Sequence, residues 1–254
     1  MPTFDWLPLL TDLADLADRI STGYFRSSDL PVEHKPDRSL VTKADLEVES
    51  AVRDELARRH PELGVFGEEH GEHEGRSGAR LIVDPIDATA NFARGLPIYA
   101  TLLAIEDEGE VVAGLVSAPA LHQRWHAARG QGAYAGTRRL QVSRVGAIED
   151  AQIFHGSLAG AEAAPGTERI PGLLARSWRQ RGLGDFYQHV LVAEGCGEIA
   201  IDVVVKPWDI APLQVIVEEA GGKATALDGS RSIYAGSLVT GNPAMHAVAL
   251  AGLA

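Results

Sequence analysis

The sequence predicts a protein of mixed helices and strands in two layered halves, an α+β half over residues 1–145 and an α/β half over residues 146–254. In the first half, apolar runs at 97–105, 111–117 and 122–128 are separated by short turns. Such runs are typical of an antiparallel meander. Further along the chain the pattern changes to alternating strands and helices, which indicates a second half of α/β character.

Two amphipathic helices are expected to open the first half. Over residues 4–25, apolar side chains recur every three or four positions between Asp and Arg, which is the spacing of one helical face. A polar segment with two prolines at 27–38 then predicts an exposed loop. Asp45 is a plausible N-cap for the second helix, which Pro61 is expected to end.

Shorter patterns predict the remaining elements. A strand at 65–66 and a polar loop at 72–80 precede the meander, and a further short strand is expected at 140–143. The second half is expected to contain, in order, a strand at 153–155, a small-residue loop at 159–166, helices at about 171–181 and 185–193, a strand at 199–201, a helix at 211–220 and a strand at 223–227.

In residues 81–92, an apolar run is followed by two aspartates and further polar residues. Pro85 cannot donate to a strand ladder, so a strand through residues 81–83 is expected to stop there. Asp87 is then a candidate helix N-cap, which would bring its carboxylate to the same turn as that of Asp84. Carboxylate oxygens suit Mg²⁺, and free N–H groups at a helix start can hold a phosphate. Considered alone, such a segment is more often an ordinary cap with a spare surface aspartate.

Three further acidic residues are candidates for the same site. Glu68 follows the expected strand at 65–66, Asp209 follows Trp208 at the start of an expected helix, and Asp45 precedes the second helix. Each of them alone is more commonly a charged loop residue or an N-cap.

Taken together, these segments resemble the motifs of the inositol monophosphatase superfamily of metal-dependent, lithium-sensitive phosphomonoesterases. The resemblance extends over nearly the whole chain. It implies a layered αβαβα sandwich, dependence on Mg²⁺ with two or three ions per active site, and usually a homodimer. The matching segments are Gly67-Glu68-Glu69, Asp84-Pro85-Ile86-Asp87-x-Thr89-x-Asn91-Phe92 and Trp208-Asp209-x-Ala211.

The resemblance also implies a set of metal ligands. Glu68, Asp84 and the backbone carbonyl of Ile86 would hold one ion. Asp84, Asp87 and Asp209 would hold a second, so that Asp84 bridges the two. Two cations would neutralise phosphoryl oxygens, lower the pKa of a bound water and stabilise the departing alkoxide.

Catalytic and phosphate-binding roles follow from the same resemblance. Thr89, together with Glu68, would position and deprotonate the attacking water, and Asp45 would help to hold a third, weaker ion. The N–H groups of Ala88 and Thr89 would hold the phosphate. The family's usual glycine is replaced by Ala88, but a helix-start residue with negative φ accepts alanine, so we expect the phosphate cradle to survive.

Within the superfamily, the segments around 117–121, 124–133, 184–186 and 191–195 are most similar to the bacterial histidinol-phosphate phosphatase branch. This similarity implies hydrolysis of L-histidinol phosphate. The alternatives are an inositol-1-phosphate or broad-range sugar and polyol phosphatase and, less favoured, a catalytically silent binding protein.

Two further aspartates are candidates for binding the alcohol part of the substrate. Asp202 matches a family position that contacts the alcohol, and Asp185 is expected at the pocket rim. A carboxylate accepts hydrogen bonds from a hydroxyl and from an ammonium group alike, so Asp202 itself leaves the choice of alcohol open.

Composition restricts the partners. The formal net charge of −12 argues against a nucleic-acid backbone or an anionic membrane surface. The chain has one cysteine and shows neither a signal peptide nor an apolar stretch long enough to cross a bilayer. We therefore expect a cytoplasmic protein whose partner is a small phosphorylated alcohol.

Overall fold

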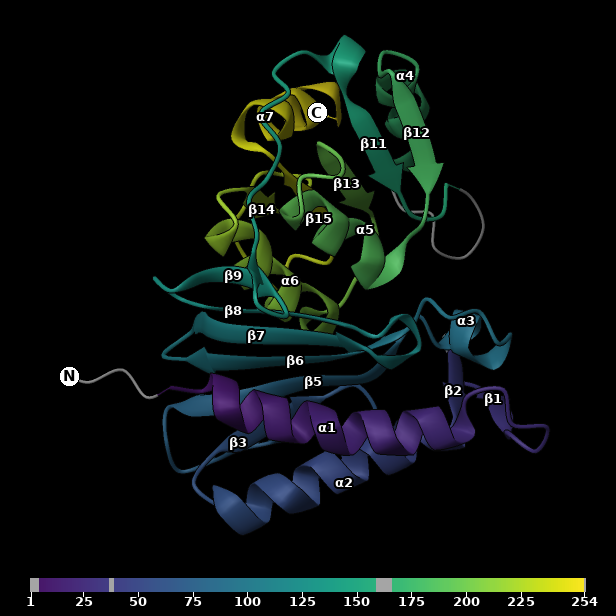
Figure 1. Ribbon diagram of the computed structural model, residues 1–254, viewed down its shortest axis with the longest axis vertical. Coiled ribbons are helices and arrows are strands. Elements are labelled where there is room, and N and C mark those ends of the chain that lie inside the picture. The colour runs from purple at the N-terminus through teal and green to yellow at the C-terminus, as the bar shows by residue number, and fades with distance from the viewer. Residues whose placement is uncertain (1–4, 37–38, 159–165, 254) are drawn as a thin grey trace.

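The computed structural model describes residues 5–36, 39–158 and 166–253, which form two large sheets and a separate two-stranded hairpin (Figure 1). The larger sheet has eight strands and is mostly antiparallel, with a parallel pair between β3 and β5. Its strands, from edge to edge, are β10 (Arg138–Arg139), β9 (Gly132–Ala135), β8 (Gln123–Ala128), β7 (Glu110–Ala118), β6 (Ala100–Asp107), β5 (Ala79–Asp87), β3 (Gly64–Gly67) and β4 (Gly71–His73).

The smaller sheet has five strands and mixes parallel and antiparallel pairs. β11 pairs in parallel with both β12 and β13, whereas β15 runs antiparallel to β13 and β14. Its strands, from edge to edge, are β12 (Arg179–Gly182), β11 (Gln152–His155), β13 (Ile199–Asp202), β15 (Leu238–Gly241) and β14 (Lys223–Thr225). The separate hairpin consists of β1 (Val32–His34) and β2 (Leu40–Thr42).

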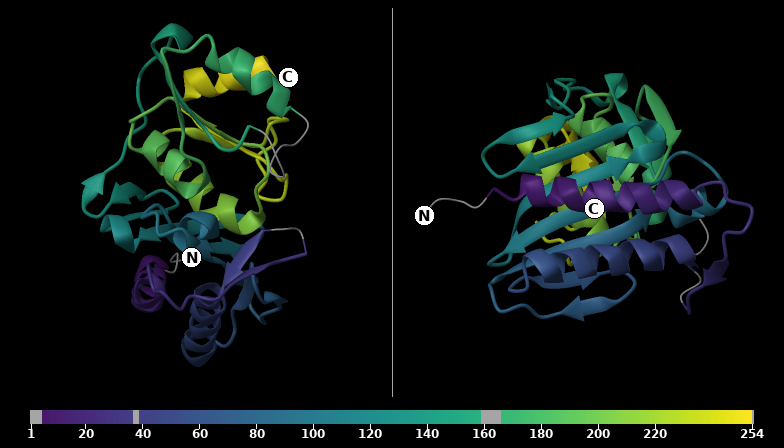
Figure 2. Two further views of the ribbon diagram at one scale, coloured as in Figure 1. Left: turned by 90° about the vertical axis from the view of Figure 1, so that its right-hand side faces the viewer. Right: turned by 60° about the horizontal axis from the view of Figure 1, so that its bottom comes forward.

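Helices alternate with the two sheets to form five layers, as Figure 1 shows from bottom to top. α1 (Leu7–Tyr24) and α2 (Lys43–Arg59) lie side by side on the outer face of the larger sheet (Figure 2). α5 (Asp185–Ala193) and α6 (Pro207–Glu219) fill the space between the sheets, and α4 (Ile170–Leu174) and α7 (Pro243–Leu253) cover the far side of the smaller sheet. The expected αβαβα sandwich is therefore confirmed.

Apolar burial on both faces of the larger sheet holds the layers together. Leu10 and Leu13 of α1 are fully buried on one face, and Trp125 and Leu213 are buried on the other, between the sheet and α6. Each such side chain contributes roughly 1.5–3 kcal/mol by leaving water. None of the helices in the described part of the chain combines the length and apolar character needed to cross a membrane.

α6 packs almost directly on the backbone of β7. A Cβ added at Gly114 would lie 2.8 Å from the Cα of Pro212, so only glycine permits this approach. Pro212 lies inside α6, because the helix begins at Pro207. A proline in a helix interior removes one backbone hydrogen bond.

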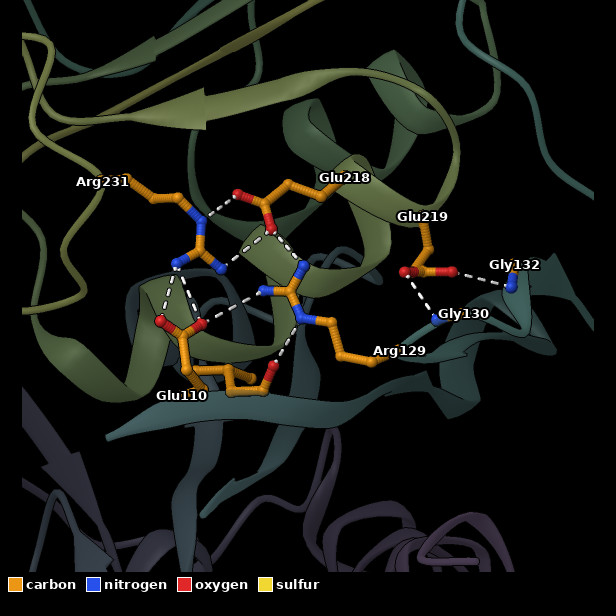
Figure 3. Close-up of polar contacts among 8 residues, drawn as sticks. Glu110, Arg129, Gly130, Gly132, Glu218, Glu219 and Arg231 are labelled. Carbon is orange, nitrogen blue, oxygen red and sulfur yellow. Dashed lines mark hydrogen bonds and ion pairs between the residues drawn. The ribbon is translucent and has the colours of Figure 1, made fainter. Parts of the chain in front are cut away.

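Ion pairs anchor the C-terminal end of α6 to the larger sheet (Figure 3). Glu218 accepts from Arg129 Nη1 at 2.6 Å and from Arg231 Nε at 2.8 Å. Glu219 accepts from the backbone N–H groups of Gly130 at 3.0 Å and Gly132 at 2.8 Å. The helix dipole disfavours negative charge at this end, and these donors compensate for it.

The structure confirms the meander of β6, β7 and β8 and the helix at 185–193, but it corrects other predicted elements. The helix predicted at about 171–181 is wrong, because only α4 is helical there and β12 follows it. The polar loop predicted at 72–80 contains the end of β4 and the start of β5.

Residues 140–143 form no strand, although Leu140 and Val142 are buried. β15 and α7 were not predicted. The predicted loop at 159–166 lies outside the described residues except for Gly166.

Candidate active site

The end of β5 carries the first two carboxylates. β5 does not stop at Pro85 but continues to Asp87, because a register shift between Asp84 and Asp87 lets the strand pass the residue that lacks an N–H. Thr101 Oγ1 donates to the carbonyl of Pro85 at 2.8 Å. The prediction that Asp87 is a helix N-cap is therefore wrong, since Asp87 is the last residue of the strand.

Ala88 is the N-cap of the short helix α3 (Thr89–Ala93) and has a left-handed backbone, with φ 64° and ψ 45°. The expectation of a negative φ at this position is wrong. Left-handed geometry costs an L-residue roughly 1–2 kcal/mol, whereas glycine adopts it freely. This geometry explains why glycine suits the position, and Ala88 stores strain beside the carboxylates.

Asp209 joins the two carboxylates of β5 from the opposite half of the chain. One potential ligand atom from each of Asp84, Asp87 and Asp209 lies within 4.8 Å of the others. Asp209 lies in the first turn of α6, where its Oδ2 accepts from the N–H of Lys206 at 2.7 Å. Asp84 Oδ1 is buried and has no hydrogen-bond partner among the described residues, so this atom is available as a ligand.

Burial and mutual repulsion make the three carboxylates hard to ionise. Burial, followed by the charges of Glu68, Asp87 and Asp209, raises the pKa of Asp84 well above its ordinary value. Burial and the charge of Asp185 raise the pKa of Asp87 in the same direction. For Asp209, burial outweighs the hydrogen bond from Lys206 and raises the pKa to about 7. A cation at this position would relieve both effects.

Glu68 lies next to this group, and its carboxylate contacts a cation of the chain. Lys35, which follows β1, places its Nζ 2.7 Å from Glu68 Oε1 and 2.6 Å from Glu69 Oε1. Burial lowers the pKa of Lys35, but its bonds and ion pairs with the two glutamates outweigh this effect and raise it.

Thr89 and Asp45 form a polar pair beside the carboxylates. Thr89 Oγ1 donates either to Asp45 Oδ1 at 3.2 Å or to the carbonyl of Ile86 at 2.9 Å. Asp45 is fully buried, and burial raises its pKa to about 6 against the hydrogen bonds from Thr42. Thr42 is the N-cap of α2 and Asp45 is its third residue, so the predicted N-cap role of Asp45 is wrong.

A cavity of about 470 Å³ extends from the carboxylates into the second half of the chain. Ala88 and Asp87 line one side, and Asp185 at the start of α5 and Asp202 at the end of β13 line the other. The N–H of Phe186 donates to Asp87 Oδ2 at 2.8 Å and so links the two sides. Of the described residues that line this cavity, four are aspartates and none is a lysine or an arginine.

Comparison with known proteins identifies the family. Residues 7–254 match the Inositol monophosphatase family. The chain belongs to this family.

Individual relatives agree with this result. The histidinol-phosphatase of Mycobacterium tuberculosis is 46% identical over 95% of both chains. The inositol-1-monophosphatase of Rhizobium meliloti is 34% identical over 84% of this chain and 82% of its own. The solved structure of a Thermotoga maritima IMPase superimposes with a TM-score of 0.89 at 29% identity, covering 98% of this chain and 97% of its own. These relatives indicate a phosphomonoester hydrolase.

Inositol monophosphatase family enzymes are metal-dependent, and the carboxylate cluster fits a hard divalent cation. Its donors are carboxylate oxygens, and one of them, Asp84 Oδ1, is buried without a hydrogen-bond partner among the described residues. Burial, followed by the negative charges nearby, raises the pKa of Asp84. Oxygen donors of this kind are those that Mg²⁺ prefers.

Two residues that support the side chains of this candidate site were not predicted from the sequence. Glu49 of α2 is fully buried and accepts from the N–H groups of Glu69 at 2.7 Å and His70 at 3.2 Å. A Cβ at Gly67 would lie 2.1 Å from its Oε1, so the glycine before Glu68 makes room for this carboxylate. His189, which contacts Asp202, is the second. Glu49 lies one helical turn after Asp45, a spacing that could have singled it out.

Proposed function

We propose that the protein hydrolyses L-histidinol phosphate to L-histidinol and phosphate in an Mg²⁺-dependent reaction. The observation that carries this proposal is the charge of the cavity. Two divalent ions would match the charges of four carboxylates, Glu68, Asp84, Asp87 and Asp209. Asp202 would then remain as a negative charge on the opposite side. An alcohol that carries an ammonium group balances this charge, whereas a neutral polyol does not.

We propose that the metal ligands are Glu68, Asp84, the carbonyl of Ile86, Asp87 and Asp209. Mg²⁺ held by these residues would supply charge that neutralises phosphoryl oxygens and acidifies a water molecule. The binding of two or three ions per site is part of the proposal. The buried Oδ1 of Asp84, which has no hydrogen-bond partner among the described residues, supports its assignment as a ligand.

Polar groups of the chain complete the proposed mechanism. Thr89 Oγ1, held by Asp45 and the carbonyl of Ile86, orients the attacking water, and Glu68 accepts its proton. The N–H groups of Ala88 and Thr89 bind the phosphate, and Asp45 helps to hold a third ion. Asp185 and Asp202 bind the alcohol.

Replacing Asp87 by asparagine tests the metal assignment, because the change removes a ligand charge without removing volume. We expect a folded protein that has lost most of its turnover at all Mg²⁺ concentrations. Circular dichroism would verify the fold, and Mg²⁺ titration calorimetry would report the lost binding independently of activity. Near-parental turnover with near-parental Mg²⁺ binding would contradict the assignment.

A second candidate is the hydrolysis of inositol 1-phosphate or of a broader range of sugar and polyol phosphates by the same residues. It is favoured by Asp202, because a carboxylate also accepts hydrogen bonds from hydroxyl groups. Steady-state constants for both esters, with and without Li⁺, would decide between the two. A large preference for the inositol ester would favour the second candidate. If Mg²⁺ stimulated hydrolysis of no small phosphate ester, a catalytically silent binding protein would be the better description.

Several accessory properties are also proposals. We propose a homodimeric, cytoplasmic enzyme of histidine biosynthesis that binds no nucleic acid, with a boundary between its halves at residues 145 and 146. Sedimentation analysis would test the dimer, and complementation of a histidine-requiring strain that lacks histidinol-phosphatase would test the pathway.

A further inference from the structure

Asp202 is held in place by two donors from α5. Its Oδ2 accepts from Gln188 Nε2 at 2.5 Å and from His189 Nε2 at 3.0 Å. Both donor residues are almost inaccessible to solvent, and both His189 and Asp202 border the cavity. Two hydrogen bonds to one carboxylate oxygen oppose rotation of the group, and the other oxygen keeps its capacity to accept.

His189 is fixed in turn by the smaller sheet. Its Nδ1 lies 2.8 Å from the hydroxyl of Thr240, which is fully buried on β15. β15 pairs with β13, the strand that ends at Asp202. Thr240, His189 and Asp202 therefore form a continuous hydrogen-bonded chain across three elements that ends at the cavity. A hydroxyl can donate or accept, so Thr240 is compatible with either role of Nδ1.

Gly156 restricts the same carboxylate from the other side. A Cβ added at Gly156 would lie 2.1 Å from Asp202 Oδ1. Gly156 follows β11, and its N–H donates to the carbonyl of Ile201 at 3.1 Å. It is not among the glycines with positive φ, so the position requires glycine for space and not for backbone conformation.

We propose that His189 is a positioning residue that fixes Asp202 against Gly156 and thereby selects phosphate monoesters whose alcohol carries an ammonium group. This inference rests on the proposed function. A carboxylate that turned away from the cavity would leave an ammonium group without its counter-ion, whereas a neutral polyol would lose a weaker hydrogen bond. The orientation of Asp202 therefore matters more for a cationic alcohol than for a neutral one.

The first test removes both hydrogen bonds of the histidine with little change in volume. We expect His189→Leu to lower kcat/KM for L-histidinol phosphate about tenfold, mainly through KM, because a charge-assisted contact is weakened. The constants for inositol 1-phosphate should stay within about threefold of the parental values. His189→Gln can still donate to Asp202 and should restore most of the selectivity.

The second test approaches Asp202 from the opposite side and leaves His189 unchanged. The methyl group of Gly156→Ala would displace the carboxylate, and we expect the same loss of preference for L-histidinol phosphate. Thr240→Val removes only the hydroxyl at the far end of the chain, so its effect should have the same direction and a smaller size. Circular dichroism and thermal melting would confirm that each variant is folded. If His189→Leu does not fold, Gly156→Ala and His189→Gln decide the question.

The outcomes separate this inference from the proposed function. If the parental protein shows no preference for L-histidinol phosphate, the proposed function fails. If the parental preference is present but the variants leave the ratio of the two kcat/KM values unchanged, the positioning role is wrong. An equal loss for both esters would show that His189 is merely structural, and this result would also overturn the proposal.

Discussion

The acidic residues at the two ends of α6 have different electrostatic surroundings. At its C-terminal end, Glu218 and Glu219 are paired with arginine side chains and backbone N–H groups (Figure 3). At its N-terminal end, Asp209 lies among Asp84 and Asp87, with no lysine or arginine among the described residues that line the adjoining cavity. The same kind of side chain is compensated at one end and left in repulsion at the other.

The helix dipole does not account for this difference. It favours an anion at the N-terminus by about 0.3–1 kcal/mol, yet the pKa of Asp209 is still raised to about 7, chiefly by burial. The chain therefore supplies arginine side chains where α6 is only anchored. Beside Asp209, no lysine or arginine is found among the described residues that line the cavity, and Lys35 pairs instead with Glu68. This contrast fits a role in stability for Glu218 and the proposed metal-binding role for Asp209.

The largest expected effect comes from Asp209→Asn, which should lower turnover by about a hundredfold or more because it removes a charge from the metal site. The asparagine oxygen can still accept from the N–H of Lys206, so the start of α6 should persist. In EDTA the variant should melt at or above the parental temperature, since one repelling charge is gone. Kinetics would check the turnover, and thermal melting would check the stability in EDTA. If turnover were unchanged, Asp209 would differ from the acidic residues at the C-terminal end of α6 in no functional respect.

Metal removal should give the protein an unusual dependence on pH. Asp209, with its pKa raised from 3.8 to about 7, binds a proton between these values in the folded protein but not in the unfolded one. Stability in EDTA should therefore fall as pH rises from about 4 to about 7, by on the order of 10 °C in Tm. Melting curves with saturating Mg²⁺ should lack this decline. If Tm declined equally with and without Mg²⁺, the carboxylate of Asp209 at the N-terminal end of α6 would not need a cation.

Glu218→Gln tests the compensated end and should act on stability alone. The change weakens two partly exposed ion pairs with Arg129 and Arg231, so we expect a loss of about 1 kcal/mol. The kcat for L-histidinol phosphate, measured well below Tm, should stay within about twofold of the parental value. Urea denaturation and kinetics on the same preparation would check this. A large loss of turnover without a loss of stability would show that this end of α6 also serves the reaction.

Ala88→Gly should have the smallest effect. The substitution relieves left-handed strain at φ 64° but makes the unfolded chain more flexible, so a net gain of about 0.5–1 kcal/mol is expected. Most alanine-to-glycine changes destabilise, which makes the sign informative. A loss of stability in urea denaturation would indicate that the backbone of Ala88, near the N-terminal end of α6, is not strained.

The strands that are specified locally and the carboxylates that cluster in the structure could be predicted from the sequence. The meander follows from apolar runs that are interrupted by turns, and Asp84, Asp87 and Asp209 were identified by short motifs. The helix predicted at about 171–181 was wrong because β12 is an exposed edge strand held by pairing with β11, a partner distant in sequence. Leu140 and Val142 are buried as a strand pattern requires, but they join no strand ladder.

Local backbone geometry and long-range side-chain contacts were beyond prediction. The left-handed conformation of Ala88 depends on how β5 ends. The residue type gives no sign of this conformation and suggested an ordinary helix start. His189 reaches Asp202 and Thr240 only because α5 packs on the smaller sheet, where β13 and β15 are neighbours. The spacing of these three residues along the chain does not indicate that they are in contact.

The cavity wall formed by β11, α5 and β13 has a consequence for how this kind of enzyme diversifies. Asp202 and its supports lie in these elements or next to them, whereas the carboxylates Asp84 and Asp87 lie on β5. Mutations of Asp202 and the residues that support it need not disturb Asp84 and Asp87. A lineage could thus acquire a new alcohol preference through a few substitutions in one wall while its hydrolytic apparatus continued to work.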